Sequence, residues 1–247
     1  MKTLSASIKV YLGLVVILSL LSGLNVFLPQ GEFLQSYQLP ASKAVVALAT
    51  VAMMLIIYGG LGFVGLQLSR KLGFADILDE RVSNHQRFVI PALAGLGLGV
   101  FFIIADALLT RLHSLGPIPH PPFPTSLVAS ATAAIGEEII FRLFFISFWV
   151  WLISYILLKK RWQNQIFWIV TIFSALAFAA SHLPSVMVLF SLKDIGQIPP
   201  MLMTEIFLIN GMLSVATAYY LRKYGFLTAV GIHFWADIVW HVIRGLY

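Results

Sequence analysis

The sequence of 247 residues contains no cysteine and few charged residues. Without cysteine the protein can have no disulfide framework, no thiolate nucleophile and no cysteine-ligated metal site. Charged residues make up 11% of the chain, whereas a soluble domain carries about 25%. Hydrophobic residues make up 60% of it. This composition excludes an ordinary soluble domain and predicts an integral membrane protein.

The apolar runs are continuous and do not alternate with polar residues, which predicts membrane-spanning helices. We expect an all-α, polytopic transmembrane helical bundle with about seven spans. The expected spans are 10–29, 44–69, 88–111, 125–158, 165–183, 201–221 and 226–243. The fourth run is long for one crossing, so it predicts either one tilted helix or a break near Arg142, which would give eight spans.

Lys and Arg residues lie in alternate connections between the spans. Lys2 and Lys9 precede the first span, the mixed-charge loop 70–87 follows the second, and 159–161 and 222–223 follow the fourth and sixth. Because cytoplasmic loops are enriched in Lys and Arg, we expect a cytoplasmic N-terminus, a solvated cytoplasmic loop 70–87 and a C-terminus outside. These loops beside anionic lipid account for the net charge of +6, so membrane lipids and no nucleic acid are the expected partners.

Three glycines match the dinucleotide-binding pattern G-x-G-x-x-G, namely Gly60, Gly62 and Gly65. No strand precedes them and they lie inside an apolar run, so we exclude a nucleotide-binding loop. Small residues in a membrane span allow two helices to approach closely. We expect close helix contacts at these glycines and at Gly95 and Gly99, which have the G-x-x-x-G spacing.

Two carboxylates and a guanidinium interrupt the fourth apolar run, at Glu137, Glu138 and Arg142. Each charged group in hydrocarbon costs roughly 2.5–3.5 kcal/mol, so such groups usually face an interior or a wet cavity. Glu138 and Arg142 share a helix face, which predicts an ion pair. Glu137 points about 100° away from Glu138 and is available for another partner.

Two later spans also carry polar residues. His182 lies near the end of the fifth span, where Pro184 is expected to end the helix, and His233 and Asp237 share one face of the seventh span. A histidine inside a membrane is a functional hypothesis that requires a partner. Counted from the loop ends, Glu137, His233 and Asp237 lie near the middle of the membrane, and His182 lies closer to the outer face. The available partners are Glu137, Glu138 and one another. The residues from three spans that could converge on one small site are Glu137, Glu138, His182, His233 and Asp237.

Taken one at a time, these polar residues have structural interpretations. Glu138 and Arg142 can form a purely structural ion pair, and His182 and His241 can be interfacial residues near helix ends. Asp106 and Glu205 lie within one or two turns of span ends and can reach the interface.

The ordered residues Glu137-Glu138-x-x-x-Arg142, Phe178-x-x-x-His182 and His233-x-x-x-Asp237 resemble the three motifs of the CPBP family. This family includes the type II CAAX prenyl endopeptidases, the Abi proteins and bacteriocin-processing or immunity proteins. The resemblance covers about 127–242. It implies a glutamate-dependent intramembrane endopeptidase of the bacterial plasma membrane, with N-terminal spans over 1–124 and a catalytic core over 125–247.

The resemblance also implies a role for each motif residue. Glu137, helped by His182, would activate water, and Glu138 and Arg142 would complete the first motif. His233 and Asp237 would stabilise the oxyanion; the family has Asn or Asp at this last position, and Asp237 can donate only when protonated. The implied substrate is a peptide or protein, lipidated or membrane-associated, and no cofactor is implied.

Three alternatives remain open. A zinc metalloprotease would use Glu137, His182, His233 and Asp237 as ligands, although the sequence has no H-E-x-x-H and Arg142 would compete for the carboxylates. A membrane scaffold or immunity protein would bind a partner through the same fold. A proton-coupled transporter would use the buried carboxylates, but no repeated half is visible.

Overall fold

The computed structural model describes residues 5–31 and 39–247. Within these ranges the chain is helical and contains no strand, and seven helices are long and apolar enough to cross a membrane. They are Ala6–Asn25, Lys43–Lys71, His85–Leu112, Thr125–Leu157, Gln163–Leu189, Pro200–Tyr224 and Phe226–Leu246. The predicted all-α membrane bundle is confirmed, and the protein is an integral membrane protein. Lys2 lies outside the described residues.

Several spans combine α-helical and π-helical segments. The α-helices are α1 (Ala6–Asn25), α2 (Lys43–Met53), α3 (Gly59–Lys71), α4 (Ile90–Leu109), α5 (Thr125–Glu137), α6 (Ser147–Val150), α7 (Gln163–Ser181), α8 (Leu183–Leu189), α9 (Pro200–Tyr224) and α10 (Phe226–Asp237). The π-helical segments are η2 (Met54–Tyr58), η3 (His85–Val89), η5 (Glu138–Ile146), η6 (Trp151–Leu157) and η8 (Ile238–Ile243). Short 3₁₀ turns are η4 (Thr110–Leu112), η7 (Ile195–Gln197) and η9 (Arg244–Leu246).

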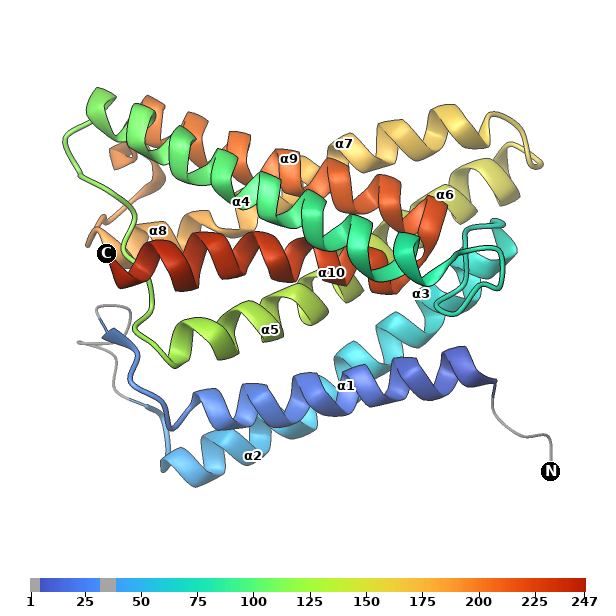
Figure 1. Cartoon of the computed structure of the whole chain (residues 1–247), viewed down its shortest axis with the longest axis horizontal. Coiled ribbons are helices and arrows are strands. Elements are labelled where there is room, and N and C mark those ends of the chain that lie inside the picture. Colours follow the sequence, from blue (N-terminus) through green and yellow to red (C-terminus); the bar gives the residue numbers. More distant parts are fainter. Residues whose placement is uncertain (1–4, 32–38) are drawn as a thin grey trace.

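The fourth span passes through the middle of the bundle. Its first segment, α5, contacts α1 on one side and α10 on the other, and α10 in turn packs against α4 and α9 (Figure 1). The span is one continuous helix from Thr125 to Leu157, so the alternative of a break into two spans is wrong. Instead, the helix widens into the π-helical segment η5 at Glu138. Such π-helical segments are frequent at functional sites.

The fifth span does not end at Pro184, as the sequence had suggested. α7 ends at Ser181, and α8 begins at Leu183 with the proline in its first turn and continues to Leu189. Proline is tolerated in a first turn because its missing N–H would have no helical acceptor there. His182 therefore lies at a junction between two helical segments of the span and not, as predicted, next to its end.

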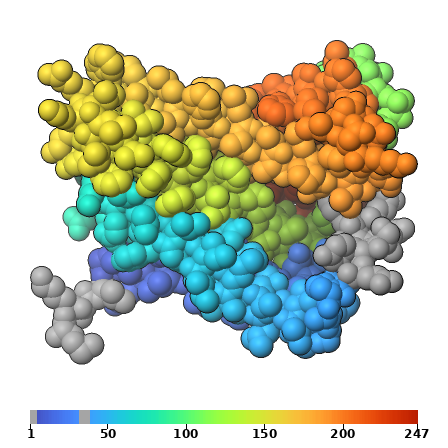
Figure 2. All heavy atoms as spheres, turned by 180° about the vertical axis from the view of Figure 1, so that it is seen from behind, coloured from blue at the N-terminus to red at the C-terminus, as the bar shows by residue number. Residues whose placement is uncertain are grey.

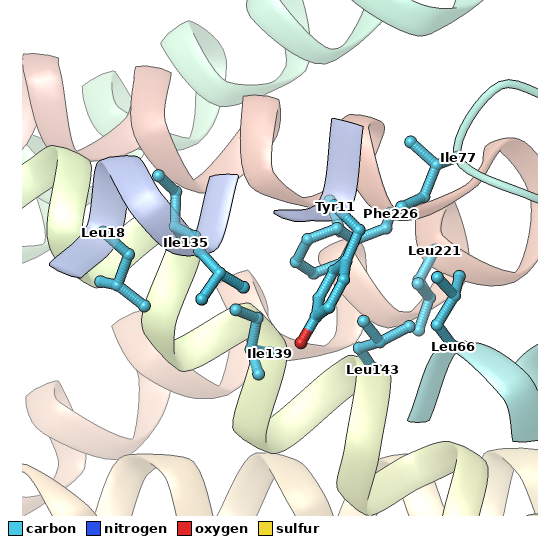
Figure 3. Close-up of a cluster of buried hydrophobic side chains, with 11 residues drawn as sticks. Tyr11, Leu18, Leu66, Ile77, Ile135, Ile139, Leu143, Leu221 and Phe226 are labelled. Carbon is cyan, nitrogen blue, oxygen red and sulfur yellow. The ribbon is translucent and has the colours of Figure 1, made fainter. Parts of the chain in front are cut away.

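Two groups of glycines allow close helix packing, as predicted, except at Gly60, where an added Cβ atom would meet nothing within 4 Å. A Cβ atom at Gly65 would overlap the backbone of Leu143 in η5, and one at Gly95 would overlap the backbone of Ile232 in α10. The contact between α3 and η5 is continued by a buried apolar cluster that also includes Tyr11 of α1 (Figure 3). The first contact holds the second span against the fourth, and the second holds the third span against the seventh.

Most of the positive residues lie at one end of the bundle, where α3, η6 and α9 end and α1 begins (Figure 1). The loop 113–124 and the C-terminus lie at the opposite end. The loop 70–87 is more ordered than a solvated connection, because Ile77 is fully buried and Arg70 forms an ion pair of 2.9 Å with Asp76.

Candidate active site

Glu138 and Arg142 form the predicted ion pair in the core of the bundle. The Nε atom of Arg142 lies 3.4 Å from Oε2 of Glu138, and both side chains are fully buried. The same Nε donates a hydrogen bond of 2.9 Å to Oγ1 of Thr217 on α9. The guanidinium also lies 4.0 Å from the ring centroid of Phe178 on α7. Arg142 thereby joins the fourth, fifth and sixth spans.

Both ring nitrogens of His233 face carboxylates. Nδ1 lies 2.9 Å from Oε1 of Glu138. Because an ionised carboxylate can only accept a hydrogen bond, Nδ1 carries the proton and donates the hydrogen bond to Glu138. On the other side of the ring, Nε2 lies 3.6 Å from Glu137 and 3.5 Å from Asp237. The hydrogen bond to Glu138 fixes the orientation of the ring, and the spacing of residues within one span could not have revealed this partner.

His182 is oriented by the backbone of its own span. Its Nδ1 donates a hydrogen bond of 2.8 Å to the carbonyl oxygen of Phe178. In a neutral imidazole the other nitrogen, Nε2, is then an acceptor. The ring of Phe178 also packs edge-on against His182 and His233. Phe178 therefore positions residues from three spans, a role that its sequence position did not reveal.

Four of the predicted site residues line one cavity of about 260 Å³. Glu137, His182, His233 and Asp237 all line it. Seen from behind, the molecular surface is hollowed between orange and olive segments, and dark red atoms of the C-terminal span are visible inside (Figure 2). A second cavity, of about 480 Å³, lies between α1, α2 and α5 and is also lined by Glu137. The side chain of Glu137 is 33% exposed, whereas that of Glu138 is fully buried.

Residues 119–239 match the family model of the Rce1-like type II CAAX prenyl endopeptidases. The chain belongs to this family of proteases. The matched stretch contains all of the motif residues described above and the whole fourth span. Neither a curated protein nor a solved structure matches the chain significantly. Family membership together with the seven spans implies an intramembrane protease.

His241 lines the same cavity as Glu137 and is not merely an interfacial residue. Its Nδ1 lies 3.2 Å from Nδ1 of His120 in the loop 113–124, and both rings pack against Trp240. The stripe that starts with His233 and Asp237 could have identified His241, because it continues the same spacing of four.

Asp106 and Glu205 are buried, which corrects the expectation that they reach the interface. Asp106 lies 3.8 Å from Arg244, and Glu205 lies 3.6 Å from His113. Neither acidic residue lines the cavity that contains Glu137. They form a separate polar cluster between the ends of three spans.

The zinc alternative requires several side chains that point at one ion. Among residues 5–31 and 39–247, no group of three or more His, Asp or Glu side chains is arranged to hold a metal ion. One nitrogen of His233 is already engaged by Glu138, and one nitrogen of His182 by a backbone carbonyl. The residues that would ligate zinc therefore do not fit the ion as they are placed here.

Proposed function

We propose that the protease hydrolyses a peptide bond in or beside the membrane, with Glu137 as the base that activates water. The observation that carries this proposal is the contrast between the two adjacent glutamates. Glu138 is fully buried and paired with Arg142 and His233, whereas Glu137 is 33% exposed and borders both cavities. A base must reach both water and the substrate, and Glu137 meets this requirement.

In this mechanism the water proton moves to the carboxylate of Glu137 as the water oxygen attacks the peptide carbonyl carbon. The same proton then passes to the leaving amine as the C–N bond breaks. His182 supports the first step because its Nε2 is a free acceptor for a hydrogen bond from the attacking water. Glu138 is a positioning residue, since it acts through His233 and Arg142.

Negative charge develops on the carbonyl oxygen during the attack and requires donors. His233 can supply one from Nε2 when its ring is protonated on both nitrogens, because Nδ1 already donates to Glu138. Asp237 lies beside that nitrogen and can supply a second donor when it is protonated. The proposed catalytic set is therefore Glu137, His182, His233 and Asp237.

The proposal extends to the surroundings of the site. Residues 125–247 form the catalytic core, and 1–124 supply spans that pack against it. The substrate is a peptide or protein, lipidated or membrane-associated, and the protease lies in a bacterial plasma membrane with its N-terminus in the cytoplasm and its C-terminus outside.

The test compares membranes that contain wild-type protein with membranes that contain Glu137→Gln, by mass spectrometry of peptide termini. New termini should appear only with wild type, while the variant keeps its wild-type elution and thermal unfolding. Glu205→Gln is the matched control, because it also neutralises a glutamate within a span but lies outside the cavity. Full turnover by folded Glu137→Gln would refute the mechanism, and a scaffold would tolerate that change.

A further inference from the structure

Both cavities that border Glu137 are lined by residues at the same end of the bundle. The loop 113–124 contributes Ile118, Pro119 and Pro121 to the first cavity, and the last turn of α8 contributes Leu189. The last turn of α1 contributes residues such as Asn25 to the second. No residue from 70–84, 158–162 or 222–225 is among those that line either cavity in the described parts of the chain.

The opposite end of the bundle carries the basic residues. They are Lys9 in the first turns of α1, Arg70 and Lys71 at the end of α3, Lys159, Lys160 and Arg161 after η6, and Arg222 and Lys223 at the end of α9. In membrane proteins, short connections with this excess of Lys and Arg face the cytoplasm. The end at which the cavities are built is therefore the one that faces outward.

The first cavity is suited to uncharged groups. Apart from the proposed catalytic residues and His241, its lining is dominated by apolar side chains such as Phe102, Ile206, Ile209 and Leu213. No Lys or Arg side chain lines the cavity within the described residues, so an acidic substrate side chain would find no counter-charge, and a basic one could pair only with the proposed catalytic carboxylates Glu137 and Asp237. Burial of an unpaired charge costs far more than burial of an apolar group.

We propose that the protease takes its substrate from the extracytoplasmic side and that this substrate is an uncharged, apolar peptide segment at the outer half of the membrane. This inference rests on the proposed function, but it adds a side and a substrate class. The lateral hollow between the orange and olive segments in Figure 2 offers such a segment a path to Glu137.

The first test measures which side of the membrane reaches the cavity and requires no proteolysis. Because the chain has no cysteine, Ala133→Cys supplies a single thiol in the lining of both cavities. A membrane-impermeant methanethiosulfonate ammonium reagent added to intact cells should label it. Ala175→Cys on α7 is the matched control, because Ala175 is buried and lines neither cavity, and it should stay unlabelled. Labelling of Ala133→Cys only from the cytoplasmic side of inside-out vesicles, or from neither side, would overturn the proposal.

The second test measures cleavage of a mixed decapeptide library in right-side-out and inside-out vesicles. Peptides should be cut at least 10-fold faster in right-side-out vesicles, and residues next to the cut should be depleted of Asp, Glu, Lys and Arg. Faster cleavage in inside-out vesicles, or charged residues at their library frequency, would overturn the proposal. If no peptide is cut by wild type or by Glu137→Gln, the proteolytic assignment fails while the labelling result still decides the side.

Discussion

Adjacent residues in the fourth span have opposite environments. Glu138 lies in the core, where Arg142 and His233 satisfy its charge, and Glu137 faces the cavities. A rotation of about 100° between consecutive helical residues is enough to separate these roles. This difference is the basis for the proposal that Glu137 is the reactive carboxylate and Glu138 a positioning residue.

We expect Glu138→Gln to destabilise the protein by about 3–5 kcal/mol, because it leaves the guanidinium of Arg142 buried without its counter-charge. The free energy of unfolding in detergent measures this effect. Glu137→Gln is the control and should change that free energy by less than about 1 kcal/mol, since Glu137 is partly exposed and forms no close ion pair with Arg142. The double change Glu138→Gln with Arg142→Met should recover part of the loss, and an equal loss in the double variant would contradict the ion-pair explanation.

Asp237→Asn should keep proteolytic activity and extend it to higher pH. Asn is a permanent hydrogen-bond donor of nearly the same shape, whereas Asp237 donates only when protonated and loses this ability as pH rises through its titration. The pH profile of cleavage for the two proteins measures the difference. A zinc ligand would behave in the opposite way, so loss of activity at every pH with rescue by excess zinc would support the metalloprotease instead.

At the scale of elements, the fourth and fifth spans meet through a cation and an aromatic ring. The guanidinium of Arg142 projects from the π-helical segment η5 onto the face of Phe178 on α7. A desolvated contact of this kind contributes about 2 kcal/mol. The backbone of α7 independently places the carbonyl of Phe178, four residues before His182, where it orients the imidazole.

Phe178→Leu should therefore lower the free energy of unfolding by about 1–2 kcal/mol more than Phe226→Leu does. Phe226 is the control, because its ring is equally buried but packs in an apolar cluster. Unfolding of the two variants in detergent measures the difference. Equal destabilisation would show that Phe178 contributes packing alone.

The loop 113–124 is held against the last span by His120. Burial, and secondarily the positive charge of Arg244, lowers the pKa of His120 to about 4 from its usual 6.5. Between these two values the unfolded chain binds more protons than the folded one, so stability is present above pH 6.5 and is lost as the pH falls toward 4.

The thermal midpoint of wild type should therefore fall more steeply between pH 6.5 and 4 than that of His120→Asn, which lacks this titrating group. His85→Asn, at an exposed histidine near the opposite end, should leave the wild-type pH dependence unchanged. If the thermal midpoint of His120→Asn fell with pH as steeply as that of wild type, His120 would not be the group that makes stability depend on pH.

At the scale of the whole molecule, the segregation of positive charge to one end predicts the orientation in the membrane. Cytoplasmic loops attract anionic lipid, and each basic residue near the surface contributes about 1 kcal/mol. Because residues at the other end line both cavities that border Glu137, the predicted orientation and the proposed side of substrate entry depend on each other.

Two exposed serines at opposite ends test the orientation without a change of charge. Ser114→Cys should react with an impermeant thiol reagent in intact cells, and Ser83→Cys should react only after the cells are permeabilised. The reverse pattern would invert the orientation and with it the proposed side of substrate entry.

The sequence by itself determined that this protein is an all-helical membrane bundle, and it placed the spans to within a few residues in most cases. The physical reason is that a lipid environment requires every backbone group to bond within its own segment, so long apolar runs must form helices. The cost of burying charge also singled out Glu137, His182, His233 and Asp237 as candidate site residues, and all four line one cavity. Spacing within one helix was enough to predict the ion pair between Glu138 and Arg142.

Only the tertiary structure decided which groups from different spans are partners. His233 hydrogen-bonds to Glu138 through one nitrogen and faces Glu137 and Asp237 through the other, although these residues belong to separate helices. The fifth span continues beyond Pro184 to Leu189, so His182 lies between two helical segments and not next to the end of the span. Sequence spacing fixes the face of a residue on its own helix, but the rotation and depth of each helix against its neighbours depend on packing of the whole bundle.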